Sequence, residues 1–417
     1  MPSAACTIGA RGASYVEMSE SSIGKWSGPA NVLAGAIASL GLMLVLSACS
    51  HSEPAAGDSR WDPKGAAAYL DRRMAWWIGW KSAARDRGTF CFSCHTVVPY
   101  ALARPALSAA LGETAPPSPE RQLLDDVRRR VRLWGQTSPF YPDEYVGPGK
   151  TAESRGTEVV LSAFMLACAD ARTGHLSADT GTAFEHMWAQ QVTSGDGAGA
   201  WAWLDFDLSP WESAAVDAQY YGAALAALAV GVAPENYQSR PQIQDSLRLL
   251  RAYLQEHYRV QSLHHQLIML WASTKLRGLL EAEQRQSLVA ELLRAQNSDG
   301  GWSLSALMAK SGKAKRSYPD SDGYATGLVT LVLEQTATPG ASAHIQRAVT
   351  WLLRNQQGHS GSWIRGQEGF WAARSLNKWH PPWSNVGRFM SDAATAYAVL
   401  ALTESSQPES AIASLPR

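Results

Sequence analysis

Two kinds of helix alternate along most of the chain, and this alternation constrains the fold more than any other feature. From residue 64 onward, apolar residues recur at helical spacing between segments rich in Gly, Pro, Asp and Ser. In each pair the first predicted helix is mixed in character, as in residues 120–134, and the second is small and apolar, as in residues 221–232. A helix that is apolar all round is buried on every side. The pattern therefore predicts an all-α fold in which six outer helices surround six inner ones, an (α/α)6 toroid.

The predicted helices cover residues 64–83, 96–111, 118–134, 156–171, 178–192, 215–230, 241–258, 262–274, 280–296, 322–334, 341–356 and 390–404. No convincing strand alternation competes with them. We expect the toroid to span residues 64–404, after a leader at 1–48 and a tether at 49–63, with a flexible tail at 405–417.

The motif Cys91-Phe92-Ser93-Cys94-His95 is C-x-x-C-H, the attachment motif of c-type haem. Two thiols one helical turn apart can bond the two vinyl groups of one haem, and the adjacent imidazole can reach the iron. With 5 Cys and 10 His in 417 residues, chance produces such a string roughly once in a thousand chains of this composition. A redox dithiol normally lies in a βαβ context, and half a zinc site would need a second ligand pair. We expect one covalent haem c, with His95 as its proximal iron ligand, embedded in the toroid.

The position of the loops predicts which end of the toroid is functional. Most connections from outer to inner helices are long, whereas those from inner to outer helices are short, and long loops on a helical scaffold usually carry function. The motif lies at the start of the second predicted helix, an inner one. The other inner helices open with acids or imidazoles: Glu158, Asp217, His264 and His265, Asp322, and Asp392. Helix capping is the ordinary interpretation of each acid, and a ring of acids and imidazoles beside the iron is the functional one.

A repeated string links the chain to a known family. Residues 296–302 (QNSDGGW) are echoed at 356–363 (QQGHSGSW), and a looser copy runs from Gln190 to Trp201. The string resembles the QW repeat of squalene-hopene cyclases and related prenyltransferases, in which Gln and Trp tie helix ends to turns. That resemblance implies an α/α toroid. Together with the C-x-x-C-H motif, it also resembles a bacterial group of exported, haem-bearing, cyclase-like proteins.

The beginning of the chain is interpreted as a targeting segment. Residues 31–47 are apolar but too short for a comfortable membrane span, and they lead into Leu46-Ser47-Ala48-Cys49. This ending resembles the lipobox of bacterial lipoproteins, which implies lipidation of Cys49 and an anchored protein in the periplasm or at the cell surface. The start is Met1 or Met18. A buried helix or a simple anchor is the alternative for this stretch.

Three functions follow from these predictions. The first is a haem-dependent oxidoreductase acting on a hydrophobic substrate such as a terpenoid, with Asp217, Glu212 or His264 as acid–base groups. The second is a periplasmic electron-transfer cytochrome whose distal ligand is His264 or His265, with Met74, Met165 and His186 as further candidates. The third is a class II cyclase, because Asp322 matches the acid of the D-x-D-D motif of that family, although Gly323 replaces its last Asp.

The composition limits the kinds of binding partner that we expect. The 37 basic and 37 acidic residues cancel, which argues against nucleic acid as the main partner. The 17 tryptophans indicate large aromatic surfaces that are packed or presented somewhere. We therefore expect haem, a hydrophobic small molecule or a redox protein, and the membrane through the lipid anchor.

Overall fold

The computed structural model describes residues 61–406 apart from 213–214, 312–313, 339 and 358–368. Contacts within the chain divide it into Met1–Asp58 and Ser59–Arg417, so the predicted toroid falls within the second unit. The predicted leader, the tether up to residue 60, Cys49 and most of the predicted tail lie outside the described residues. No helix in the described part of the chain combines the length and the apolar character needed to cross a membrane.

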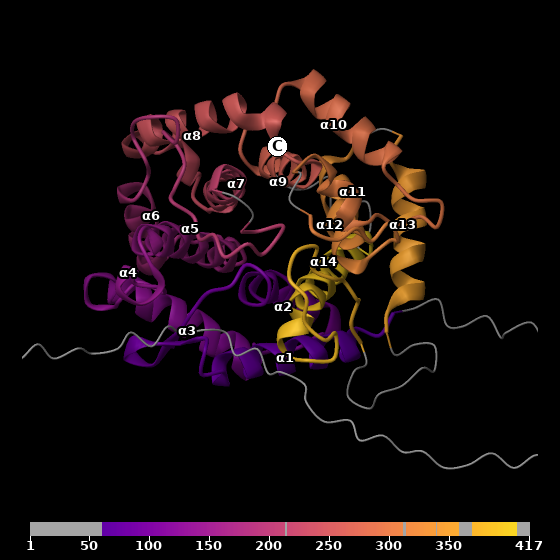
Figure 1. The fold of residues 1–417 in the computed structure, drawn as a ribbon, viewed down its shortest axis with the longest axis horizontal. Coiled ribbons are helices and arrows are strands. Elements are labelled where there is room, and N and C mark those ends of the chain that lie inside the picture. The colour runs from indigo at the N-terminus through magenta and orange to yellow at the C-terminus, as the bar shows by residue number, and fades with distance from the viewer. Residues whose placement is uncertain (1–60, 213–214, 312–313, 339, 358–368, 407–417) are drawn as a thin grey trace, which may run out of the picture. The chain divides into compact units, whose positions relative to one another are not determined.

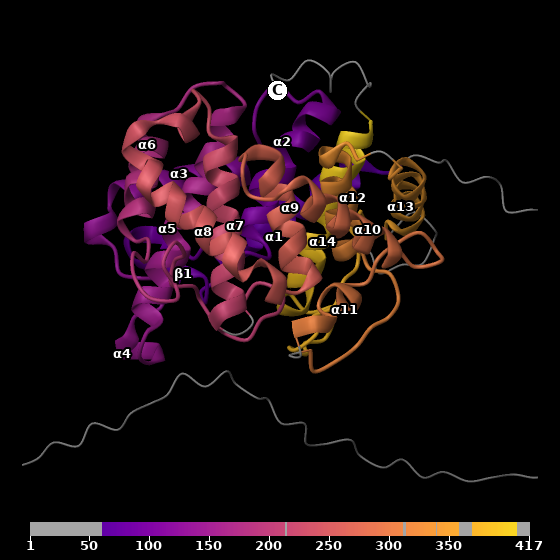
Figure 2. The ribbon, with the colours of Figure 1, turned by 90° about the horizontal axis from the view of Figure 1, so that it is seen from above.

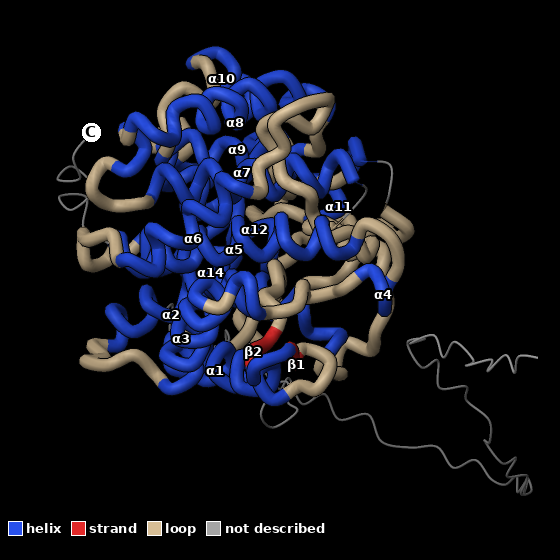
Figure 3. Tube along the Cα trace, turned by 90° about the vertical axis from the view of Figure 1, so that its left-hand side faces the viewer, coloured by secondary structure: helices blue, strands red, loops and turns tan. Residues whose placement is uncertain are grey.

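The predicted all-α class is confirmed, because helices form almost all of the regular structure described (Figure 3). The inner helices are α2 (Val97–Leu111), α5 (Lys150–Ala171), α7 (Ala215–Val232), α9 (Leu263–Lys275), α12 (Gly323–Thr336) and α14 (Phe389–Ser405). The outer helices are α1 (Pro63–Gly79), α3 (Ser118–Arg132), α6 (Ala178–Ala189), α8 (Gln244–His257), α10 (Ala282–Arg294) and α13 (Ser342–Asn355).

The inner helices form a closed ring. Each packs on the next in the order α2, α5, α7, α9, α12 and α14, and α14 returns to pack on α2. Each outer helix also packs on the inner helix of the preceding pair, so that α1 packs on α14. Figure 1 shows the result, with the indigo and yellow ends of the described chain side by side. Most residues of the inner helices are buried, as their apolar sequences predict, although the last turn of α2 is exposed or half-buried.

Short elements that the sequence pattern does not predict connect the long helices, both within and between the pairs. They are α4 (Asp143–Val146), α11 (Leu304–Leu307) and an antiparallel pair of two-residue strands, β1 (Ala84–Arg85) and β2 (Thr89–Phe90). The 3-10 helices are η1 (Asp86–Gly88), η2 (Trp134–Gln136), η3 (Tyr237–Ser239), η4 (Pro241–Ile243), η5 (Tyr258–Val260), η6 (Ala309–Ser311) and η7 (Val386–Arg388). Since α4, α11 and β1–β2 all precede inner helices, they lie on one side of the ring, which we call the mouth (Figure 2).

Two helix boundaries differ from the prediction by more than three residues. Helix α1 ends at Gly79 rather than residue 83, because Trp80 adopts an extended backbone. Helix α5 begins at Lys150 rather than residue 156, after Gly149 in the left-handed region. Its first turns are polar, so the apolar periodicity begins only one to two turns inside the helix.

The Gln and Trp repeats tie outer helices together, but the partners differ in part from those predicted. Each Trp indole N–H donates to a carbonyl at the end of an outer helix: Trp201 to Met187, Trp302 to Leu292, and Trp371 to Leu352. The third Trp is therefore Trp371, and the predicted Trp363 lies outside the described residues. Each Gln amide reaches the start of the next outer helix: Gln191 to Ser246, Gln296 to His344, and Gln356 to Asp62. The first Gln is thus Gln191, one residue after the predicted Gln190.

Candidate functional site

The C-x-x-C-H motif lies between β2 and the start of α2, at the mouth of the ring. Cys91 and Cys94 are free thiols, each 4% exposed, and His95 is 6% exposed. The Ser93 hydroxyl accepts hydrogen bonds from the backbone N–H groups of Thr96 and Val97, which fixes the turn into α2. The Trp77 indole donates to the Cys91 carbonyl over 2.8 Å. The motif is therefore a buried and firmly held turn at the position that the sequence predicts.

Burial sets the protonation of the motif. It raises the pKa of the Cys91 thiol, and that of Cys94 more strongly, so both are neutral thiols at neutral pH. The charge of Glu212 acts in the same direction on both. Burial, aided by the positive charge of Arg73, lowers the pKa of His95 to about 3. A neutral imidazole is the form that can bind a metal ion.

A chain of hydrogen bonds leads from His95 to a buried ion pair. His95 Nδ1 lies 2.9 Å from the Thr96 hydroxyl, which donates to Asp392 Oδ2 over 2.7 Å. Asp392 is 1% exposed and binds Arg73 through both carboxylate oxygens, at 2.6 and 3.0 Å. The Tyr69 hydroxyl also donates to Oδ1 over 2.9 Å. Asp392 therefore joins α1, α2 and α14, and it makes no side-chain cap of α14, contrary to the ordinary interpretation of its sequence position.

Aromatic rings enclose the imidazole. Phe389 stacks on His95 with ring centroids 3.9 Å apart, and Trp77 meets it edge-on at 5.2 Å. Trp76 and Trp80 each pack against both Trp77 and Phe389. Neither this cluster nor Arg73 was among the site residues predicted from the sequence. A signal was present, because Tyr69, Arg73 and Trp77 are spaced by four residues and so share one face of α1.

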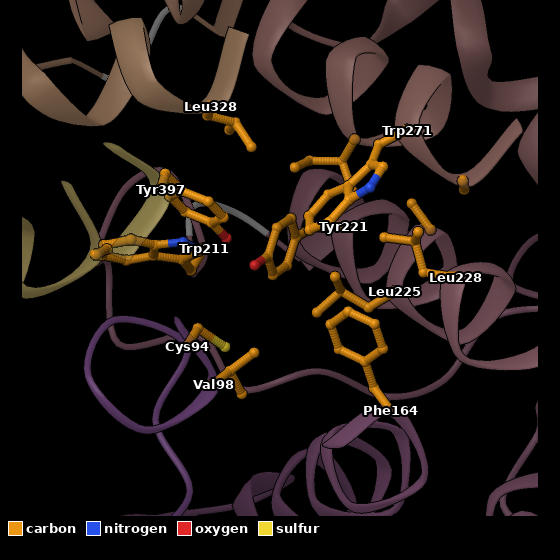
Figure 4. Close-up of a cluster of buried hydrophobic side chains, with 14 of the residues drawn as sticks. Cys94, Val98, Phe164, Trp211, Tyr221, Leu225, Leu228, Trp271, Leu328 and Tyr397 are labelled. Carbon is orange, nitrogen blue, oxygen red and sulfur yellow. The ribbon is translucent and has the colours of Figure 1, made fainter. Parts of the chain in front are cut away.

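The inner helices bring further aromatic side chains to the centre of the ring. Figure 4 shows the Tyr221 and Tyr397 hydroxyls pointing toward one another, with Trp211 and Cys94 in the same cluster of buried side chains. All four are at most 4% exposed. Cys94 thus faces an aromatic interior rather than solvent.

Asp322, the predicted cyclase acid, is the N-cap of α12. Its Oδ1 accepts from the backbone N–H of Ala325 over 2.9 Å, and its Oδ2 accepts from that of Leu304 over 2.6 Å. Burial raises its pKa to about 6, although the backbone donors oppose this shift. The carboxylate therefore links α11 to α12, which is the capping role that its position also suggested.

The two adjacent histidines of α9 have different partners. His265 is fully buried, with Nε2 3.0 Å from the Pro210 carbonyl and Nδ1 3.3 Å from the Gln261 side chain. His264 Nε2 lies 2.8 Å from the Tyr324 hydroxyl, and its buried Nδ1 has no hydrogen-bond partner among the described residues. Burial lowers the pKa of both. Among the described residues, aromatic ring contacts connect His95 to His264 through Trp211 and Tyr324.

The remaining predicted acids are dispersed. Glu212 lies at the mouth, where burial raises its pKa to about 8. Glu158 is buried against Arg130 at 2.5 Å and so serves an internal ion pair. The side chain of Asp217 lies outside the described residues. The structure therefore places Asp322 and Glu158 in separate structural contacts, whereas Glu212 contributes to the raised pKa of both thiols.

Comparisons with known proteins do not assign the chain to a family. No protein-family model and no curated protein matches the chain. Among solved structures, a protein named "Glycosidase E178A" is 12% identical, with 82% of this chain and 98% of that chain covered and a TM-score of 0.44. At this level of similarity, the activity in that name belongs to the matched protein and is not transferred to this chain.

These findings correct the functional predictions. A solved structure that the comparison finds is named a glycosidase, and no family model or curated protein matches the chain, so the predicted haem-dependent oxidoreductase and its electron-transfer and cyclase alternatives are withdrawn. Within the part of the chain that the structure describes, no three or more His, Cys, Asp or Glu side chains are grouped to hold a metal ion. A metal site built from several protein ligands is therefore not supported there. The three activities are not proposed further.

Proposed function

We propose that the ring is a covalent haem-binding protein, which holds one c-type haem through Cys91 and Cys94 with His95 Nε2 as an iron ligand. The observation that carries the proposal is the placement of His95, a buried imidazole that directly follows Cys94 and whose Nδ1 lies 2.9 Å from the Thr96 hydroxyl. The proposal concerns binding alone and includes no catalysed reaction.

The chemistry of the motif fits the group. Each thiol can add across one vinyl group, so that sulfur bonds to one carbon and the thiol hydrogen passes to the other, with no oxidant needed. Both thiols are free. The aromatic side chains around Cys94 supply the apolar surroundings that a planar macrocycle requires. When bound, the haem would supply an iron with His95 on one side.

The absorption spectrum and intact mass of the protein, produced in a host that attaches c-type haem, test the proposal. We expect one covalently bound haem per chain that survives acid extraction. The double variant Cys91→Ala/Cys94→Ala should lose it. The matched control is Cys168→Ala, which removes a cysteine of α5 outside the motif and should retain the haem. A wild-type chain without covalent haem, or a double variant that keeps it, would contradict the proposal.

We further propose that the protein is exported and anchored by a lipid on Cys49. The support is the leader of residues 31–47 and the sequence that ends in Cys49. A radioactive fatty acid should label the wild-type chain and place it in the membrane fraction, whereas Cys49→Ala should remain unlabelled. Labelling of the variant would contradict this assignment.

A further inference from the structure

The direction of every hydrogen bond around Asp392 can be worked out from the donors present. Oδ1 faces Arg73 Nε and the Tyr69 hydroxyl, and Oδ2 faces an Arg73 terminal nitrogen and the Thr96 hydroxyl. The two hydrogen bonds from the guanidinium hold Asp392 as a carboxylate, which can only accept. The Thr96 hydroxyl must therefore donate its hydrogen to Oδ2.

That direction decides the tautomer of His95. A hydroxyl has one hydrogen, and Thr96 donates it to Asp392. The Thr96 oxygen can therefore only accept a hydrogen bond from the imidazole 2.9 Å away. The donor is then Nδ1–H. A neutral imidazole carries one N–H, and Nε2 is consequently left with a lone pair.

We propose that Thr96, Asp392 and Arg73 are positioning residues that hold His95 as its Nδ1–H tautomer, so that the Nε2 lone pair is formed before any ligand arrives. The use of that lone pair for iron rests on the proposed haem site, but the tautomer does not. Hydrogen bonds to the second nitrogen are a general means of fixing a ligating imidazole. Here the three residues come from α1, from the start of α2 and from α14.

Nitrogen NMR of the haem-free protein labelled with ¹⁵N-histidine tests the proposal directly. His95→Gln assigns the signal. In the wild type we expect a single species with a protonated Nδ1 and a bare Nε2. Thr96→Val keeps the shape of the side chain but removes the hydroxyl, and should convert His95 to a mixture of tautomers or to Nε2–H. The matched control Thr96→Ser keeps the hydroxyl and should retain Nδ1–H. An unchanged Nδ1–H signal in Thr96→Val would overturn the proposal.

A second variant covers the case in which Thr96→Val does not fold. Asp392→Asn offers Thr96 either a donor or an acceptor, so a mixture of tautomers at His95 is again expected, and a pure Nδ1–H species would overturn the proposal. Unchanged signals from His264 and His265 show that the fold is retained. If the wild type shows Nδ1–H but takes up no haem, the proposed function fails and this inference stands. If haem is attached while Thr96→Val leaves the His95 tautomer unchanged, the proposed function stands and this inference fails.

Discussion

Gln356 and Asp62 exchange two hydrogen bonds across 294 residues of sequence. The Asp62 backbone N–H donates to Gln356 Oε1 over 2.7 Å, and Gln356 Nε2 donates to the Asp62 carbonyl over 2.9 Å. Asp62 is the N-cap of α1, and Gln356 follows the last residue of α13. The pair therefore joins the last outer helix to the first, and it occupies the position that the other Gln repeats use between consecutive outer helices.

Gln356→Ala should lower the free energy of unfolding by about 1–3 kcal/mol, because it removes both hydrogen bonds, together with one from Gln356 Nε2 to the Gly369 carbonyl, and takes away the acceptor of the Asp62 backbone N–H. The exposed neighbour provides the control, and Gln357→Ala should change stability by no more than about 0.5 kcal/mol. Urea unfolding followed by circular dichroism measures both. Equal midpoints for the two variants would contradict the role assigned to this pair.

Gly222→Ala should destabilise the protein by about 1–3 kcal/mol, because a Cβ at this position of α7 would lie 2.2 Å from the Trp203 indole. Trp203 is buried and its N–H is bonded to the Trp211 carbonyl, so the ring has little room to move. The matched helical control is Gly181→Ala in α6, where a Cβ meets nothing within 4 Å. That variant should gain roughly 0.5–1 kcal/mol from helix propensity. Thermal unfolding of the pair should therefore give shifts of opposite sign.

The stability of the protein should fall with rising pH through a contribution from Asp126. Burial raises the pKa of this carboxyl from 3.8 to about 7. Between these values the folded state binds a proton that the unfolded state has lost, so the contribution is complete below the lower pKa, is lost as pH rises toward about 7, and is constant above it.

Asp126→Asn keeps an acceptor for the Phe90 N–H and removes the charge. The variant should match the wild type near pH 4 and be more stable at pH 8, by on the order of 4 kcal/mol, because raising the pKa from 3.8 to about 7 is worth about 1.4 kcal/mol per pKa unit. Asp125→Asn, at an exposed position one residue away, is the control and should leave the pH profile unchanged. Denaturant midpoints at a series of pH values decide this, and parallel profiles for wild type and Asp126→Asn would show the prediction to be wrong.

The helices were predictable because their burial is continuous. An inner segment such as residues 221–232 is small and apolar at almost every position, which indicates burial on all sides, and it forms part of α7. The candidate site was predictable only in part. The C-x-x-C-H motif and the inner-helix acids are local signals, but the partnership of Arg73 with Asp392 spans 319 residues and depends on how the ring closes. Sequence spacing carries no information about such a contact, and the same acid therefore suggested a helix cap.

The closure of the ring has a consequence for how the molecule can open. Neighbouring helix pairs are elsewhere joined by the continuous chain. The first pair (α1 and α2) and the sixth pair (α13 and α14) meet only through noncovalent contacts. Separation at this junction would stretch no loop and break no covalent bond, and it would expose the Tyr69, Arg73 and Thr96 side of Asp392. The junction thus lies beside His95, the imidazole that a large ligand would have to reach.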